Sequence, residues 1–205
     1  GIVDDLEGSG HIALAHGVVN GQEIPSASIE MAAQGHVMEA THIQLAAASG
    51  SAVGQASYDY ETGAVRGLLT GQHFALEQIA SLKTSHLPIG GTLAFYMQAS
   101  GTMSSPIATG AMQVENLTLD HQPMGRLHAE TQLQGGMLSI TSRADLLDTH
   151  LDAAGHVQLS GNYPAQAQLT FAGFNVEPLL RIMASSGVNA TSSIDGKITM
   201  LGPLK

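Results

Sequence analysis

The chain contains no cysteine and no tryptophan, and only 4% of its 205 residues are aromatic. Without cysteine the protein forms no disulfide and has no thiolate for catalysis or metal binding. Lysine and arginine number only 7 against 17 aspartates and glutamates, so the formal net charge is −10. This balance argues against a nucleic-acid partner, because phosphates require a basic surface.

Long apolar runs are also absent. No segment approaches the roughly 20 consecutive apolar residues of a membrane-spanning helix, and no basic-then-apolar signal peptide opens the chain. The first residue is Gly1 rather than methionine, and Gly202-Pro203-Leu204-Lys205 has the composition of a linker. We therefore expect this chain to be a fragment of a longer protein.

The clearest pattern is the stretch Arg126–Ala144, in which apolar and polar residues alternate on both sides of Gly135-Gly136. Alternation with period two is typical of a strand with one apolar face. Two glycines supply the positive φ values of a two-residue hairpin turn. The spacing predicts a hairpin in which Leu133 faces Leu138 and Thr131 faces Ile140, with both apolar sides on one face of the sheet.

The same pattern occurs 100 positions earlier. The segment 27–41 aligns with 127–141 without a gap, so that Glu30 falls on Glu130 and Gly35 on Gly135. In both segments the apolar residues occupy the same alternate positions of the alignment. The sequence therefore predicts two tandem units of about 100 residues, 1–100 and 101–205, in one continuous sheet, with a third unit beginning near the end of the chain.

Each unit is expected to consist mostly of strands followed by one short helix. In the second unit the alternation predicts strands over Gly110–Leu119, Met124–Gln134, Met137–Ala144, His150–Ser160 and Ala165–Ala172. Helical spacing predicts a helix over Val176–Met183, capped by Asn175, and a matching helix over Phe74–Leu82 in the first unit.

A sheet with one apolar face must cover that face. A sandwich covers it with a second sheet, and a barrel covers it by closing on itself. A sheet that curls along its length, with short helices as partial lids, leaves an apolar trough instead. Pattern alone favours a packed sandwich core over the trough.

Three segments carry a resemblance to a known family: Ala99–Pro106, Gly110–Leu119 and Gln122–Leu127. The order and spacing of their small and apolar residues resemble those in the repeats of the translocation and assembly module proteins, the TamB/AsmA-like family. Phe171–Leu180 is similar to the step from strand to helix that ends those repeats. The likeness covers most of the chain and consists mainly of small and apolar residues.

The resemblance implies an all-β fold, a curved antiparallel β-sheet groove or β-taco with an apolar interior. It also implies the periplasmic part of an inner-membrane-anchored protein of a diderm bacterium, from the middle of such a protein. The family is linked to phospholipid transport towards the outer membrane, and TamB also to the assembly of outer-membrane proteins. The expected partners are therefore phospholipid acyl chains and, through parts outside this fragment, an outer-membrane assembly protein.

The groove hypothesis selects apolar residues of one parity, which would hold acyl chains by dispersion and the hydrophobic effect, about 0.8 kcal/mol per buried CH₂. These residues are Ile29, Met31, Leu93, Phe95, Met97, Met112, Val114, Leu127, Leu133, Leu138, Ile140, Val157, Leu159, Leu169, Phe171, Ile198 and Met200. With the resemblance, the open groove becomes the favoured interpretation.

The sequence offers little sign of catalysis. It has no nucleophile elbow, no P-loop and no S-x-x-K motif. Asp148, His150 and Asp152 share one side of a predicted strand and are candidate metal ligands. Their parity places them opposite Leu151 and Ala153, so a solvated polar face is the favoured interpretation, and we expect no cofactor and no enzymatic activity.

Two other classes of protein stay open at this point. One is a structural or adhesive β-repeat, such as a surface stalk or an array of sandwiches with closed cores. The other is a polysaccharide-acting enzyme on a β-repeat, which requires converging carboxylates.

Overall fold

A computed structural model describes residues 6–83, 88–146, 149–175 and 193–203. These residues form twelve strands. The strands are β1 Leu6–Val19, β2 Gln22–Gly35, β3 Val37–Ala47, β4 Gly50–Asp59, β5 Val65–Ala75, β6 Ile89–Thr102, β7 Ser105–Leu119, β8 Gln122–Gln134, β9 Met137–Leu146, β10 Thr149–Gln158, β11 Pro164–Asn175 and β12 Ser193–Pro203.

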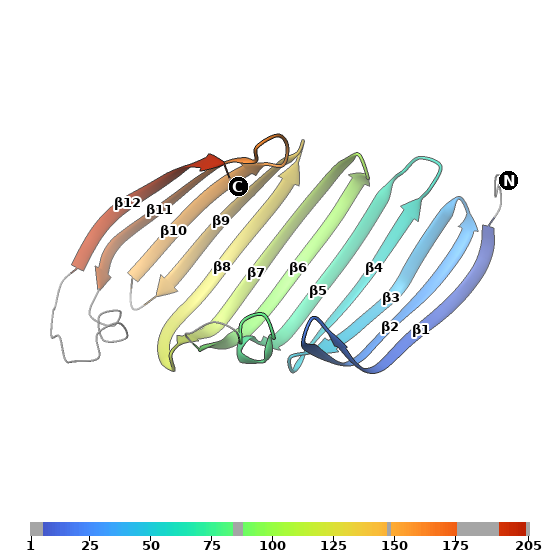
Figure 1. Cartoon of the computed structure of the whole chain (residues 1–205), viewed down its shortest axis with the longest axis horizontal. Helices are drawn as coiled ribbons and strands as arrows, with labels where there is room; N and C mark the ends of the chain where they lie inside the picture. Colours follow the sequence, from blue (N-terminus) through green and yellow to red (C-terminus); the bar gives the residue numbers. More distant parts are fainter. Residues whose placement is uncertain (1–5, 84–87, 147–148, 176–192, 204–205) are drawn as a thin grey trace.

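The twelve strands lie side by side in sequence order, each antiparallel to the next, in one curved sheet (Figure 1). The strands are 10 to 15 residues long and most follow each other after turns of a few residues. Such short connections favour antiparallel neighbours, because parallel strands need long crossovers. The all-β, antiparallel and curved character expected from the sequence is confirmed.

The hairpin at Gly135-Gly136 forms with the register that the sequence predicts. Leu133 lies opposite Leu138 and Thr131 opposite Ile140. Both turn glycines have positive φ, 59° and 74°, as a hairpin turn that matches the right-handed twist of the strands requires. Local turn chemistry therefore fixes which face each side chain of β8 and β9 occupies.

The sheet does not close on itself. Among the described residues β1 and β12 have a partner on one side only, at opposite ends of the strand order (Figure 1). The chain exposes 13361 Å², whereas a compact globular protein of 21.2 kDa would expose about 9,000 Å². The difference reflects a single layer whose faces have no second sheet over them in the described part of the chain.

One expected helix is wrong. The segment Phe74–Leu82 is not an α-helix: β5 continues to Ala75, and only a 3₁₀ turn, Leu76–Gln78, follows. Ile79 returns to an extended backbone at φ −76° and ψ 118°, which ends the turn. The apolar side chains that mimic helical spacing instead pack onto the sheet, since a helix this short gains too little from its own hydrogen bonds. The other expected helix, Val176–Met183, lies outside the described residues.

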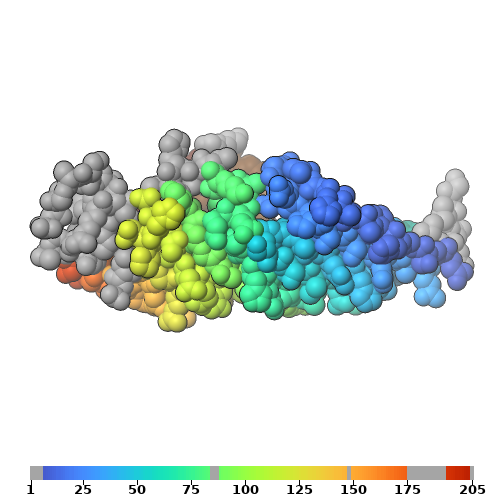
Figure 2. Space-filling view, turned by 90° about the horizontal axis from the view of Figure 1, so that it is seen from below, coloured from blue at the N-terminus to red at the C-terminus, as the bar shows by residue number. Residues whose placement is uncertain are grey.

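Burial is concentrated at one end of the strands, which we call the covered rim. It contains the turns between β1 and β2, β3 and β4, β5 and β6, and β7 and β8. Figure 2 shows the β1–β2 turn (blue), the segment after β5 (green) and the β7–β8 turn (yellow) rising above one side of the sheet. The buried cluster here consists of Ile24, Ala47, Ala48, Ala52 and Phe74.

The segment after β5 is fastened to three neighbouring parts of the covered rim. The backbone N–H of Ala80 donates to the side chain of Gln22 at 2.8 Å, and the hydroxyl of Ser49 donates to Gln78 at 2.8 Å. The backbone N–H of Gly91 donates to Glu77 at 3.4 Å. These contacts hold the segment over the sheet as a fixed wall.

Sharp backbone turns recur at a constant spacing. Six pairs of residues with positive φ lie 100 positions apart: His16 and Asn116, Asn20 and Asp120, Gly21 and His121, Gly35 and Gly135, Gly63 and Tyr163, and His73 and Gly173. Positive φ is uncommon for residues other than glycine. Six bends in the part of the chain from β1 to β6 thus have a counterpart between β7 and β12.

Phe74 is the aromatic anchor of the covered rim: it is 7% exposed, and its ring centroid lies 5.6 Å from that of Phe95. We expect Phe74→Ala to lower the free energy of unfolding by about 3 to 5 kcal/mol, as large truncations in packed cores do. Chemical denaturation followed by circular dichroism measures the change. Met97→Ala is the control, because Met97 is 51% exposed and its truncation leaves no cavity. Equal losses in the two variants would contradict a core confined to the covered rim.

Candidate functional site

The register joins apolar side chains into rows that cross the whole sheet. The pairing places in one row Ile12, Ile29, Ile43, Gly54, Leu69, Met97, Gly110, Thr131, Ile140, Gly155, Ala167 and Met200. The neighbouring row contains Leu14, Ala27, Leu45, Ala52, Gly71, Phe95, Met112, Ala129, Ser142, Ala153, Leu169 and Ile198. We call the surface that these rows form the apolar face.

Neither row contains a charged residue. The large side chains of these rows are partly exposed to solvent. Ile12 is 56% exposed, Met97 51% and Ile140 47%. Near the covered rim the next residues on this face are buried, and Val114 is only 3% exposed. The apolar face is thus packed at one end of the strands and accessible over the rest.

Glycines on the apolar face make room for aromatic rings on neighbouring strands. A Cβ at Gly71 would overlap the ring of Phe95, its partner across β5 and β6. A Cβ at Gly196 would lie 2.5 Å from the ring of Phe171, its partner across β11 and β12. Each glycine therefore leaves the space above its backbone to the aromatic ring of its cross-strand partner.

The apolar face is hollowed towards the end of the strands opposite the covered rim, which we call the open rim. A cavity of about 640 Å³ lies there on β2 to β5 and reaches the β6–β7 turn. Its apolar lining includes Met31, Met38, Tyr58, Val65 and Met103. Methionine side chains are flexible and polarizable, which suits contact with apolar ligands of varied shape.

The register places most of the predicted groove residues on the apolar face. Leu159 is the exception, because β10 ends at Gln158 and Leu159 lies in the following bend, 43% exposed. Val114 lies on this face but is buried at the covered rim. Sequence reasoning missed further members with the same period-two parity: Ile12, Leu14, Ile43, Leu45, Leu69 and Leu151.

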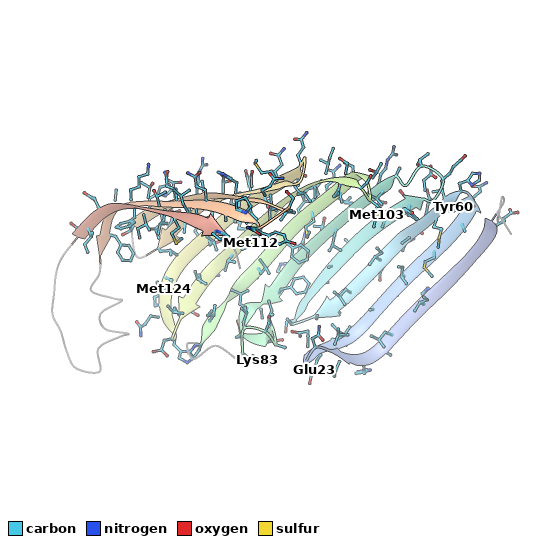
Figure 3. The ribbon with its side chains drawn as sticks, turned by 45° about the horizontal axis from the view of Figure 1, so that its top comes forward. Glu23, Tyr60, Lys83, Met103, Met112 and Met124 are labelled. Atoms are coloured by element: carbon cyan, nitrogen blue, oxygen red, sulfur yellow. The ribbon has the colours of Figure 1, made fainter. Side chains whose placement is uncertain are left out.

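The opposite face carries the charged residues of the strands, and we call it the polar face. In Figure 3 the sticks with nitrogen and oxygen atoms gather along the upper side of the ribbon. Glu30 and His42 pair there at 2.9 Å, and His128 and Glu130 at 3.2 Å. A cavity of about 480 Å³ on this face has a mixed lining that includes Gln55, Arg66 and Tyr96, which suits an acyl chain less well than the methionine-lined cavity does.

A chain of ion pairs connects β8, β9 and β10 on the polar face. Arg126 lies 2.6 Å from Asp145, whose other oxygen lies 2.8 Å from His150. His150 also approaches Asp152 at 3.5 Å, and Asp152 lies 3.6 Å from Arg143. The hydrogen bonds from His150 and Arg126 hold the pKa of Asp145 below its usual range, because they stabilise the carboxylate.

The proposed metal ligands are thus engaged with each other and with arginines. His150 and Asp152 are partners in the ion-pair chain, and Asp148 lies outside the described residues. In the described part of the chain, no three histidine or acidic side chains are arranged to hold a metal ion. The arrangement stabilises the pairing of β8 to β10 across the polar face.

No protein-family model matches the chain, and neither the curated proteins nor the solved structures contain a match. The resemblance to TamB/AsmA-like repeats therefore rests only on the sequence segments described above. Within the described residues no helix has the length and hydropathy needed to cross a membrane.

The lowered pKa of Asp145 makes a pH dependence testable. A carboxyl whose pKa is lower in the folded state adds stability above its unfolded pKa of about 3.9, and this contribution is lost as the pH falls through the folded pKa. We expect Asp145→Asn to be less stable than the unmodified chain at pH 7, with the difference shrinking below about pH 4. Melting temperatures across this pH range measure it. Glu39→Gln, an exposed change on β3, is the control, and an equal effect there would contradict the assignment.

Proposed function

We propose that this chain is a non-enzymatic segment of a lipid conduit whose apolar face carries phospholipid acyl chains across the strands. The observation that carries the proposal is the pair of uncharged rows that cross all twelve strands with exposed members such as Met97 and Ile140. Soluble proteins rarely expose a contiguous apolar surface of this extent without a binding role. The surface has no converging polar groups, so it suits a ligand recognised by apolar contact alone.

The dimensions of the apolar face suit movement along it. Twelve strands spaced about 4.8 Å apart give a surface roughly 50 Å long across the strands. One leaflet of a bilayer core is about 15 Å deep, half of the ~30 Å hydrocarbon thickness. The apolar face is therefore longer than one lipid, which favours a path over a single binding pocket.

The energetics also favour a path. Each buried CH₂ contributes about 0.8 kcal/mol, and an open surface covers only part of each chain. Because both rows are uncharged, an acyl chain that shifts by one strand loses contacts and gains similar ones. A ligand held in this way has no single preferred position, and its head group stays in solvent beyond the open rim.

The spacing of the strands supports a chain built of tandem units. Strand beginnings at Gln22 and Gln122 lie 100 residues apart, as do those at Val37 and Met137, and the paired positive-φ residues have the same spacing. We infer two tandem units, 1–100 and 101–205, in one sheet.

The TamB/AsmA-like resemblance adds the setting: the periplasmic part of an inner-membrane-anchored protein of a diderm bacterium, in phospholipid transport or in support of outer-membrane protein assembly.

Mass spectrometry of organic extracts from the purified chain tests the proposal. We expect phospholipid at a near-stoichiometric amount. The double variant Leu138→Asp, Ile140→Asp places two carboxylates on the apolar face of β9 and should reduce the bound lipid at least tenfold, because charges oppose the entry of acyl chains.

The matched control is Ser139→Asp, Thr141→Asp, which adds the same charge to the same strand on the polar face. Ser139 pairs with Gln132 and Thr141 with Glu130, away from the apolar rows. Circular dichroism confirms that each variant is folded. A lipid-free and monomeric chain, or equal loss of lipid in both variants, would contradict the proposal and favour a structural or adhesive β-repeat.

A further inference from the structure

Burial of the apolar face changes along the length of each strand. On β4 the side chains of this face run from Ala52, which is 2% exposed, to Tyr58 near the open rim, which is 38% exposed. The row that follows the two apolar rows towards the covered rim is enclosed, and it includes Phe74 at 7% and Val114 at 3%. The accessible part of the apolar face therefore ends at a definite depth from the open rim.

Two aromatic rings mark this depth on β5 and β6. The ring of Phe95 occupies the space above Gly71, and its centroid lies 5.6 Å from that of the buried Phe74. The segment after β5 begins with the buried Leu76 and rises above the sheet at the same place (Figure 2). We call Phe74, Phe95 and the segment Leu76–Gln78 the end wall, and we call the apolar surface between the end wall and the open rim the trough.

The length of the trough matches one acyl chain. Val65 lines the methionine-lined cavity at the open rim, and Gly71 lies beneath the ring of Phe95 on the same strand. A strand rises about 3.4 Å per residue, so these two residues lie roughly 20 Å apart. The acyl region of one bilayer leaflet is about 15 Å deep. The trough therefore holds one acyl chain from end to end, but not two in line.

The polarity of the trough fixes the direction of such a chain. Between the cavity and the end wall, the positions of this face on β5 and β6 are Gly67, Leu69, Met97 and Ala99, which carry no polar side chain. A polar head group at the end wall would lose its contacts with water without gaining hydrogen bonds, which is unfavourable. The head group therefore lies beyond the open rim, and the terminal methyl group points to Phe95.

We propose that the end wall acts as a stop for the terminal methyl group of a bound acyl chain, with Phe95 as the residue that sets the longest chain the trough encloses. The inference rests on the proposed function, because it concerns an acyl chain on the same apolar face. The buried row continues the stop across neighbouring strands, since Val114 on β7 is 3% exposed and Ala144 on β9 is 7% exposed. A lipid that moves across the strands thus keeps the same depth.

Competition binding with lysophosphatidylcholines tests the proposal. A series in which the single saturated chain lengthens in steps of two carbons displaces a fluorescent fatty acid from the purified chain, below the concentration at which micelles form. We expect the affinity to rise roughly two- to fourfold for each added carbon, as for a partly or fully buried methylene group. The affinity should reach a plateau when the chain fills the trough, because further carbons stay in water beyond the open rim.

Two variants should move this plateau in opposite directions. Phe95→Ala opens the space above Gly71 and should shift the plateau to longer chains. Met97→Trp places a larger ring nearer the open rim and should shift the plateau to shorter chains. Met97 is 51% exposed, so the second variant keeps the core intact and carries the test even where loss of the Phe95 ring weakens folding. Gln98→Trp, an exposed change on the polar face of the same strand, is the matched control and should leave the plateau unchanged.

The possible failures are distinguishable. If no chain length displaces the probe, the proposed function fails, and this inference fails with it. If the affinity rises through the longest chain, or if neither variant moves the plateau, the end wall is not a stop, although the lipid path stands. If Gln98→Trp moves the plateau as Met97→Trp does, the chain does not lie in the trough, and the inference is overturned.

Discussion

Cross-strand register is the constraint on which the rest of this structure depends. Successive side chains of a strand point to opposite faces, so a slip of one residue moves every apolar side chain of that strand to the other face. Here the hydrogen-bonded ladders keep one parity from Ile12 in β1 to Met200 in β12, and bulges such as that between Glu30 and Met31 are absorbed without loss of the apolar face. The turns set this register locally, and the ion pairs of the polar face reinforce it between β8 and β10.

The strand pattern could be predicted from sequence because it depends on local chemistry. Period-two alternation and Gly135-Gly136 were sufficient for the register of β8 and β9, residue by residue. The segment after Phe74 was predicted wrongly because Leu76, Ile79 and Ala80 have a spacing that suits either one face of a helix or a turn folded onto a sheet. Only the neighbouring backbone decides between them, and Ala75 donates to the carbonyl of Ala48, 27 positions earlier in the chain, at 2.8 Å.

The difference between the two rims could not be predicted either. The apolar residues near the covered rim and those near the open rim have the same period-two parity, so alternation alone does not separate them. Burial depends on the wall formed by the segment after β5 and on bends at His16, His73 and Asn116, where residues other than glycine adopt positive φ. The ion pair of Arg126 with Asp145 follows the same register of β8 and β9, and it was missed because the predicted strand ended at Ala144, one residue before Asp145.

The covered rim has a mechanical consequence. The strand ends at the covered rim are held by packing, whereas the ends at the open rim are not covered. The strands therefore bend more easily towards the open rim. Small rotations of the strands about the Phe74 cluster would spread or narrow the open rim without breaking the hydrogen-bond ladders. Such bending would change the width of the hollow near the open rim by rotation of whole strands.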